Sequence, residues 1–494
     1  MQMKLVTPEA VGIPSERVLR FVRTLEENRL STHHLRMARG NFVFFSHDWA
    51  PFTPDFPHRQ YSVSKSFVSL AVGFAVQDGL LSLDDPISKF FPAECEAYAD
   101  DYVKHQTVRH MLMMSTAKPA LNWFRKRSPD RVAVYFDNPG PSRPSGTLFE
   151  YDSSGSFVLG AMVERLTGKP FMEYLREKLF RTIGVSEEAR CLKCPGGHSW
   201  GDSGVLCTAD DLLLTARFVL NGGSWSGKQI LSSSYVRAAT SKQIDNSLEG
   251  APGWETLGYG YQFWIGYDNS FFFNGMGCQF ALCVPGKDLI LVINSDNQGK
   301  PEARKIILDA FREQIVKPAD EPLPENHAAY TALRDYADPL ALAADAGSTD
   351  SPVRERISGR EFVLKPNPMG MERFTLTLDR DGGVFSWTNA TGDHELPFGM
   401  CENVFGLFPE EGYSDETGSV PEPGHTYRSA SSAAWVSPFQ LHLKVQIIDK
   451  YFGTMNALFG FADGPDGEPR AAVQMNKTAE DFLDGYAGFA ASAY

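Results

Sequence analysis

The chain has 494 residues, of which 43% are hydrophobic, 12% aromatic and 22% charged, with a formal net charge of −14 at pH 7. This composition is typical of a folded globular protein and excludes disordered, fibrous and membrane-embedded chains. A single hydrophobic core rarely grows beyond about 250–300 residues. We therefore expect one large domain and a second, smaller one.

The negative charge is concentrated in one part of the chain. Residues 317–494 carry 13 Lys and Arg against 27 Asp and Glu, whereas residues 1–316 carry 34 of each kind. An acidic surface repels both the phosphates of nucleic acids and anionic lipid headgroups. We therefore expect neither a nucleic acid nor a membrane as a partner.

Three features bear on the cellular compartment. The longest apolar run, residues 67–76, is about half of the ~20 residues that cross a bilayer. The first residues, MQMKLVTPEA, lack the basic-then-apolar order of a secretory signal. The seven cysteines are odd in number and widely spaced, which favours reduced thiols over a disulfide framework. The sequence thus predicts a cytoplasmic protein.

The first 316 residues predict a sheet with strands from both ends of the segment. Residues 35–39 and 42–46 flank a Gly40-Asn41 turn, as in a β-hairpin. Residues 271–284 and 289–294 are strand-like around a turn at 285–288, and an amphipathic helix near 306–311 follows. The pattern between these ends is mostly helical. We therefore predict an α/β domain over residues 1–316, an antiparallel sheet flanked by helices with a helical subdomain.

The last third of the chain has a different pattern. Residues 317–354 are rich in Pro, Ala, Asp and Ser, which predicts a linker with a short helix near 330–342. From 355 to 494 apolar residues recur at every second position, as at Phe439, Leu441, Leu443, Val445 and Ile447. This alternation predicts an acidic accessory domain, 355–494, folded as an antiparallel β-barrel or sandwich.

A serine and a lysine stand one helical turn apart near the start of the chain. The segment from Tyr61 to Gly79 has apolar residues at helical spacing, so Ser62 and Lys65 share one face. A serine hydroxyl attacks a carbonyl only when a base takes its proton, and a neutral lysine amine can be that base. The pair therefore predicts a nucleophile and its base.

Other motifs imitate reactive sites. Residues 115–118 (STAK) repeat the spacing, but Pro119 follows and disfavours a helix there. Residues 197–201 (GHSWG) and 201–204 (GDSG) resemble serine-hydrolase motifs but lack the strand before and the helix after. We expect all three to be structural, and Cys191-x-x-Cys194, without a second pair, to bind no metal. The alternating Tyr259, Tyr261, Phe263 and Trp264 either line an acyl pocket or pack in the core.

Four motifs in order resemble those of the penicillin-binding protein and class C β-lactamase-like serine hydrolases, in their esterase and amidase branch. The first is S-x-x-K at 62–65, and the second is Tyr151-Asp152-Ser153, which resembles the family's Y-x-N. Residues 204–231 resemble a segment common in class C-like esterases. Residues 271–284 (FFFNGMGCQFALCV) resemble the strand that carries K-T-G or H-x-G. The resemblance covers about residues 8–316.

This resemblance implies a role for each matching position. Ser62 would become acylated, Lys65 would share its proton, and Tyr151 would relay a proton to the leaving group. The backbone amides of Ser62 and Met276 would form the oxyanion hole. The substrate would be bound by Ser153, Asn274, Gly275 and Gly277.

Two positions depart from the family's pattern. Ser153 stands where the family has asparagine, and Phe273 stands where K-T-G has its lysine, which normally supports recognition of a substrate carboxylate. We therefore expect a serine hydrolase acting on a small-molecule ester or amide, including small peptide-like amides, with no metal and no other cofactor. The same departures leave an alternative open, a binding or regulatory protein that keeps the fold and acylates weakly or not at all.

Overall fold

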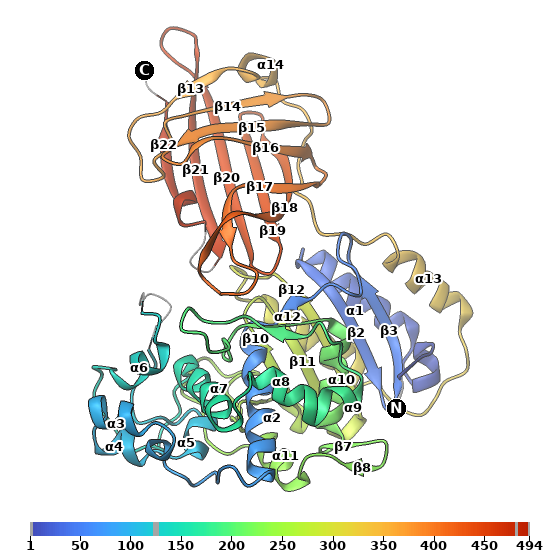
Figure 1. The fold of residues 1–494 in the computed structure, drawn as a ribbon. Coiled ribbons are helices and arrows are strands. Elements are labelled where there is room, and N and C mark those ends of the chain that lie inside the picture. Colours follow the sequence, from blue (N-terminus) through green and yellow to red (C-terminus); the bar gives the residue numbers. More distant parts are fainter. Residues whose placement is uncertain (1–2, 122–127, 480–482, 493–494) are drawn as a thin grey trace. The chain divides into compact units, whose positions relative to one another are not determined.

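The computed structural model describes residues 3–121, 128–479 and 483–492. Contacts divide the chain into two compact units: Met1–Ala341 with Glu416–Gly418, and Leu342–Asp415 with Ser419–Tyr494 (Figure 1). The main division, after Ala341, falls inside the segment that the sequence assigns to a linker. The domain limits at 316 and 355 remain a prediction.

The first unit is built on a largely antiparallel sheet, as predicted, and this sheet has seven strands. Its order is β1-β3-β2-β12-β11-β10-β9, and every pair is antiparallel except β1 with β3. The strands are β1 (Lys4–Leu5), β2 (Thr32–Arg39), β3 (Phe42–Asp48), β9 (Trp264–Ile265), β10 (Phe271–Gly275), β11 (Gln279–Val284) and β12 (Leu289–Ser295).

One predicted strand divides into two. The strand-like run 271–284 is interrupted by a tight turn, where Gly277 and Cys278 both have left-handed backbones with φ near 74° and 71°. Gly277 adopts that conformation without strain, which permits the reversal from β10 to β11.

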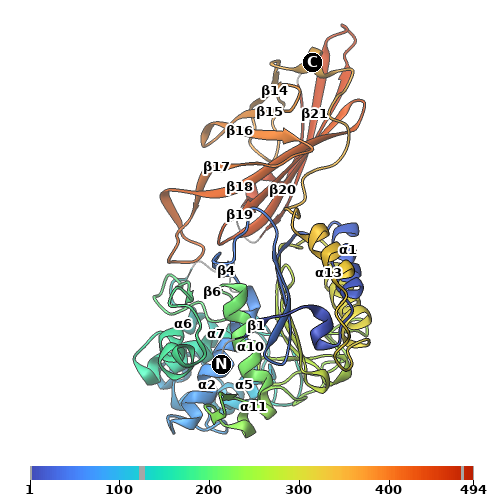
Figure 2. The same cartoon turned by 90° about the vertical axis from the view of Figure 1, so that its right-hand side faces the viewer.

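Helices cover both faces of this sheet (Figure 2). One face is covered by α1 (Ser15–Glu27), α12 (Ala303–Phe311) and α13 (His327–Ala337), which share one apolar core with the sheet. The other face carries α2 (Ser64–Gln77), α7 (Ser153–Thr167) and α10 (Ala209–Leu220). All residues of α2 from Ser64 to Ala75 are buried, as in a helix that is enclosed on every side.

Smaller elements surround α2 and α7. The helical subdomain places α3 (Pro92–Tyr98), α4 (Asp101–His105), α5 (Val108–Leu112) and α6 (Arg131–Phe136) beside α7 (Figure 1). A separate three-stranded sheet has the order β4-β6-β5. Its strands are β4 (His58–Arg59), β5 (Arg190–Cys191) and β6 (Val205–Cys207).

The second unit is one ten-stranded sheet curled into a half-barrel, which confirms a β-rich second domain. The two end strands of this sheet approach each other, because the backbone amide of Lys365, just after β13, donates to the carbonyl of Ala491 in β22 at 3.0 Å. The strands are β13 (Glu361–Val363), β14 (Arg373–Leu378), β15 (Gly382–Asn389), β16 (Gly392–Met400), β17 (Val404–Tyr413), β18 (Pro421–Ser437), β19 (Gln440–Ile448), β20 (Phe452–Asp463), β21 (Pro469–Ala479) and β22 (Gly488–Ala491).

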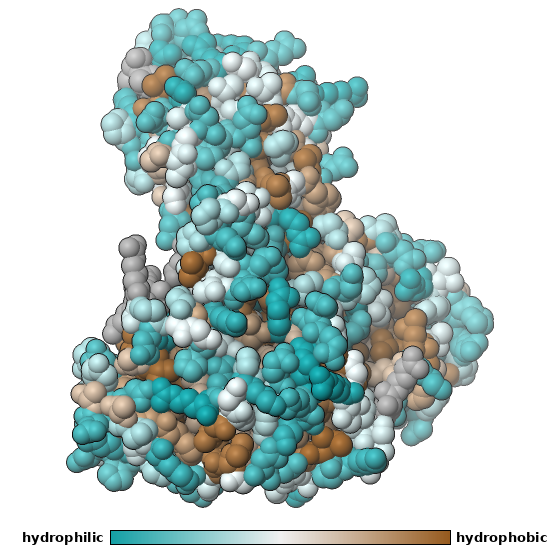
Figure 3. Space-filling view, viewed as in Figure 1, coloured by the Kyte–Doolittle hydropathy of each residue, from teal (hydrophilic) through white to brown (hydrophobic). Residues whose placement is uncertain are grey.

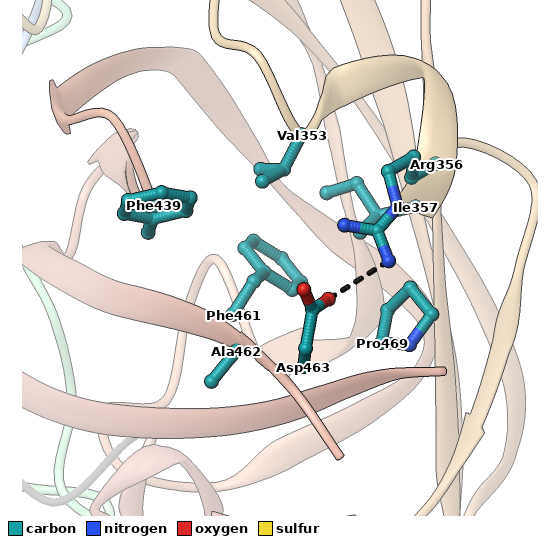
Figure 4. Close-up of a pocket in the computed structure, with 8 residues that line it drawn as sticks. All are labelled: Val353, Arg356, Ile357, Phe439, Phe461, Ala462, Asp463 and Pro469. Carbon is teal, nitrogen blue, oxygen red and sulfur yellow. Dashed lines mark hydrogen bonds and ion pairs between the residues drawn. The ribbon is translucent and has the colours of Figure 1, made fainter. Parts of the chain in front are cut away.

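The predicted alternation on β19 is confirmed with one exception. Leu441, Leu443, Val445 and Ile447 are buried, whereas Phe439 precedes the strand and is 52% exposed. Phe439 instead lines a cavity of about 250 Å³ within the second unit, where Arg356 pairs with Asp463 at 2.8 Å (Figure 4). This volume is below that of a typical small-molecule site.

No helix among the described residues is long and apolar enough to cross a membrane. The face drawn in Figure 3 is mostly hydrophilic, with its apolar residues in separate spots.

The buried histidines make stability depend on pH. His58 is fully buried, and its two ring nitrogens bond to the Arg59 carbonyl and to His33. Burial holds the pKa of His58 well below its usual value, and the nearby His34 lowers it further. The unfolded chain takes up this proton near pH 6.5 and the folded chain does not, so stability falls as pH drops below that value.

We therefore predict that acidification from pH 7.5 to 5.5 costs the native protein about 1 kcal/mol more than it costs His58→Gln, which cannot titrate. Urea unfolding midpoints at the two pH values measure the difference. His327→Gln, on an exposed side chain of α13, is the control. Equal acid sensitivity in native protein and His58→Gln would contradict the prediction.

Candidate active site

Ser62 lies on a tight turn between β4 and α2. The turn is the short 3₁₀ helix Tyr61–Val63, and Tyr61 before the serine has a left-handed backbone with φ 47°. This conformation costs a non-glycine residue about 1–2 kcal/mol, so the surrounding contacts must hold it. They do so through β6: the Gln60 amide donates to the Val205 carbonyl at 2.8 Å, and the Val205 amide donates to Ser64 Oγ at 2.9 Å.

Lys65 lies one turn along α2 with its nitrogen against the serine. Lys65 Nζ is 2.9 Å from Ser62 Oγ and donates a second hydrogen bond to the backbone carbonyl of Asp202 at 2.8 Å. The lysine is 2% exposed, whereas Ser62 is half-buried. The amine is therefore fixed behind a hydroxyl that remains accessible.

Tyr151 approaches the pair from a distant segment, just before α7. Lys65 Nζ lies 5.1 Å from the centre of the Tyr151 ring, which is half-buried. The Tyr151 ring also stacks on the ring of Trp264 in β9, with 5.5 Å between the ring centroids. The other aromatics of that segment, Tyr259, Tyr261 and Phe263, are buried, and Tyr151 also packs against the small cluster of Met114, Phe149 and Tyr259.

The end of β10 abuts the nucleophile turn. A Cβ atom on Gly275 would lie 2.5 Å from the carbonyl oxygen of Gln60, so only glycine allows this approach. Met276 follows and is 36% exposed, and its carbonyl accepts from Gln279 Nε2 at 2.9 Å. The end of β10 therefore lies against Gln60, two positions before Ser62.

Ser153 and Asn274, two of the predicted substrate-binding residues, lie on α7 and β10. Ser153 is the first residue of α7, and among residues 3–121, 128–479 and 483–492 no hydrogen bond joins it to Ser62 or Lys65. Asn274 Nδ2 donates to Glu255 at 2.6 Å, and Glu255 pairs with Arg304. The Nδ2 group of Asn274 is therefore already bonded, whereas its Oδ1 atom is buried without a partner in the described structure.

The serines of the second S-x-x-K sequence and of residues 197–201 have partners other than a lysine. Ser115 Oγ donates to the His110 carbonyl, whereas Lys118 Nζ donates to the Gly140 carbonyl and pairs with Asp100. Ser199 is buried in a loop, where its amide lies near Glu164. Within the described chain neither serine has a lysine partner of the Ser62 kind.

The residue that sequence reasoning missed is Asp202. Its segment was expected to be a structural loop, yet its carbonyl is the second acceptor of the Lys65 nitrogen. No local sequence pattern predicts this contact, because 137 residues separate Lys65 from Asp202.

One group of side chains in the described residues has the donors to hold a metal ion. Asp415, His425 and Asp449 of the second unit bring their ligand atoms within 4.8 Å of one another. Asp415 pairs with Lys450, and Asp449 accepts the backbone amide of Arg428 at 3.1 Å. Since these carboxylates already have partners in the protein, the group gives no independent sign of a metal.

The chain is similar in sequence to known proteins of one family. The β-lactamase family model matches residues 37–313. Among curated proteins, the 6-aminohexanoate-dimer hydrolase of Paenarthrobacter ureafaciens is 26% identical over 219 residues, which cover 40% of this chain and 55% of that enzyme. Penicillin-binding protein 4 of Amycolatopsis lactamdurans is 28% identical, over 55% of this chain and 80% of its own length. The chain spans about half the length of the first of these relatives.

Solved structures show the same fold. A Bacillus anthracis protein assigned to the 6-aminohexanoate-dimer hydrolases has a TM-score of 0.52 at 18% identity, covering 66% of this chain and 89% of that one. EstCE1, a hydrolase with promiscuous acyltransferase activity, has a TM-score of 0.50 at 17% identity, covering 60% of this chain and 97% of its own.

The contact between β10 and the nucleophile turn makes a prediction about Gly275. We expect Gly275→Ala to push the strand from the Gln60 carbonyl and to lower the rate of Ser62 acylation roughly 10²-fold. Gly286→Ala is the matched control, because nothing lies within 4 Å of a Cβ atom there. Acylation rates with an activated ester measure both variants, and equal rates would show that the approach of the strand is unimportant.

Proposed function

Because the chain belongs to the β-lactamase family, we propose that it is a serine hydrolase that cleaves an ester or amide through an acyl-enzyme on Ser62. The observation that carries the proposal is the 2.9 Å contact between Lys65 Nζ and Ser62 Oγ, with the Tyr151 ring 5.1 Å from the same nitrogen. A hydroxyl, an amine and a phenol from separate segments converge here, as acyl transfer requires.

In the proposed acylation, Ser62 Oγ bonds to the substrate carbonyl carbon while its proton passes to the neutral amine of Lys65. The tetrahedral intermediate then collapses and expels an alcohol or amine, which receives the proton through the Tyr151 hydroxyl. In deacylation a water molecule attacks the ester carbon, the carboxylic acid leaves, and Ser62 regains its proton. Each step returns Lys65 and Tyr151 to their starting forms.

The developing oxyanion would be bound by the amides of Ser62 and Met276. The short approach at Gly275 supports this arrangement, since it brings the end of β10 to the serine turn. Gln279 fixes the Met276 carbonyl and, through a second bond at 2.6 Å, the carbonyl of Ser295 on β12. Preorganised donors of this kind lower a barrier because they need no rearrangement during the reaction.

Phe273 bears on the substrate class. Its side chain is fully buried and packs edge-on against Phe263 with 4.9 Å between centroids. The position that carries the K-T-G lysine in the family is thus occupied here by a core side chain. We therefore infer a substrate without a carboxylate at that point, and the similarity to a 6-aminohexanoate-dimer hydrolase supports a non-β-lactam amide or ester.

The first test is covalent labelling. We expect a fluorophosphonate probe to modify the full chain once, at Ser62, and Ser62→Ala to remain unmodified by intact mass. Ser115→Ala, in the second S-x-x-K sequence, should be labelled like the native protein because its hydroxyl is bonded to a backbone carbonyl. Undiminished labelling of Ser62→Ala would end the proposal.

The second test concerns the base. We expect Lys65→Ala to lower turnover of p-nitrophenyl esters at least 10²-fold, because general-base catalysis contributes about 10²–10⁴-fold. The variant should remain folded, which its melting curve checks. Lys118→Ala, in the second S-x-x-K sequence, should keep native turnover. Normal ester hydrolysis by folded Lys65→Ala would contradict the assigned role.

The hydrogen bond from Asn274 to Glu255 favours one alternative function, that of a binding protein that is acylated without releasing product. The mass of the native protein after mixing with acyl donors separates the two functions. A transient adduct with steady product release supports the hydrolase, and a persistent adduct without release supports the alternative.

A further inference from the structure

Asp202 carries a buried carboxyl group that the proposed reaction has not used. The residue is 0% exposed, and both carboxyl oxygens are buried without a hydrogen-bond partner in the part of the chain that the structure describes. Its backbone carbonyl, in contrast, accepts from Lys65 Nζ at 2.8 Å. Buried carboxylates are almost always hydrogen-bonded, because an unpaired one has lost its solvation without compensation. This exception calls for a physical explanation.

The charges around the carboxyl group are mainly cationic. Burial raises the pKa of Asp202 to about 6, against the charges of Lys65 and Arg131, the residue's own backbone amide and the charge of Arg59, all of which favour the ionised form. The groups that act on Asp202 come from several elements: Lys65 of α2, Arg59 of β4, Arg131 of α6, and the thiols of Cys191 and Cys194.

Arg59 and Arg131 are held by other groups of the protein. Arg59 Nε donates to the Ser203 carbonyl at 3.1 Å, and Arg131 Nη1 donates to Cys194 Sγ at 2.7 Å. Both guanidinium groups lie over the Trp200 ring, at 4.6 and 4.9 Å from its centre. These contacts hold the two cations in place, and guanidinium groups keep their charge throughout the physiological pH range. Asp202, in contrast, has a pKa of about 6.

A purely structural carboxylate would cap a helix or bond a buried donor, as Asp211 does for the amides of Ser186 and Thr208. The oxygens of Asp202 do neither in the described structure. What the group does supply is a buried charge that interacts with Lys65, the cation that acts most strongly on it. An electrostatic effect is strong there because the medium screens little.

We propose that Asp202 is a positioning residue for Lys65, whose buried carboxylate stabilises the ammonium form of Lys65 when that amine has taken the proton of Ser62. The inference rests on the proposed function. As the Oγ–carbon bond forms, the proton moves to Lys65 Nζ, and Asp202 neither gains nor loses a proton. The carboxylate favours transfer of the proton to Lys65, and it also opposes formation of the neutral amine that accepts this proton.

These two effects have opposite consequences, which gives the variant a distinctive pH profile. Asp202→Asn keeps the shape of the side chain and removes its charge. We expect the acidic limb of Ser62 phosphonylation to move about one pH unit lower, because the neutral amine persists to lower pH. We expect the plateau at high pH to fall about tenfold, because the remaining base is weaker.

The experiment uses the full chain and measures the second-order rate constant for a fluorophosphonate probe from pH 4.5 to 9.5. In this reaction Ser62 Oγ bonds to phosphorus, fluoride leaves, and no deacylation step intervenes. Glu26→Gln is the matched control: its carboxyl group lies on α1, accepts from Trp49 Nε1 at 2.8 Å, and has a pKa that burial raises. Its profile should equal the native one.

A uniform loss of rate in Asp202→Asn, with the acidic limb unmoved, would indicate a merely structural role and overturn the inference. Asp202→Ser, smaller and also uncharged, gives a second reading if the asparagine variant fails to fold, and it should show the same displaced limb. Failure of the proposed function is distinguishable, because the native protein itself would then not be labelled at Ser62.

Discussion

The site depends on one hydrogen-bonded contact, that between the amine of Lys65 and the hydroxyl of Ser62. Two features fix it: the one-turn spacing on α2 and a second acceptor, the Asp202 carbonyl, which holds the nitrogen from the other side. An ordered lysine side chain loses about 2 kcal/mol of rotamer entropy, and these bonds offset that cost. The result is an amine that is oriented before any substrate arrives.

A buried polar network extends this order to the sheet. Asn294 of β12 donates to Gln60 at 3.1 Å and to Gln279 at 3.3 Å, so it joins the residue before the serine turn to the residue that fixes Met276. Such networks are costly when incomplete and rigid when satisfied. Here the network connects three segments, the nucleophile turn, β11 and β12, into one support for the reacting centre.

All the side chains assigned to the reaction belong to the first unit, whereas the excess acidic charge lies in residues 317–494. The second unit has its own curled sheet and its own buried rows of apolar residues.

The amino-acid sequence by itself determined the parts of this protein that depend on neighbours in the chain. The pairing of Ser62 with Lys65 follows from helical spacing, the β2–β3 hairpin from its Gly-Asn turn, and the rows of β19 from alternation, because each is a local relation. Tyr151 was found only through its resemblance to a family motif. The division of 271–284 into two strands, the bond from Asn274 to Glu255, and the position of Asp202 behind Lys65 were decided by tertiary structure. These contacts join segments whose approach depends on how whole elements pack, and no local pattern of residue types encodes that packing.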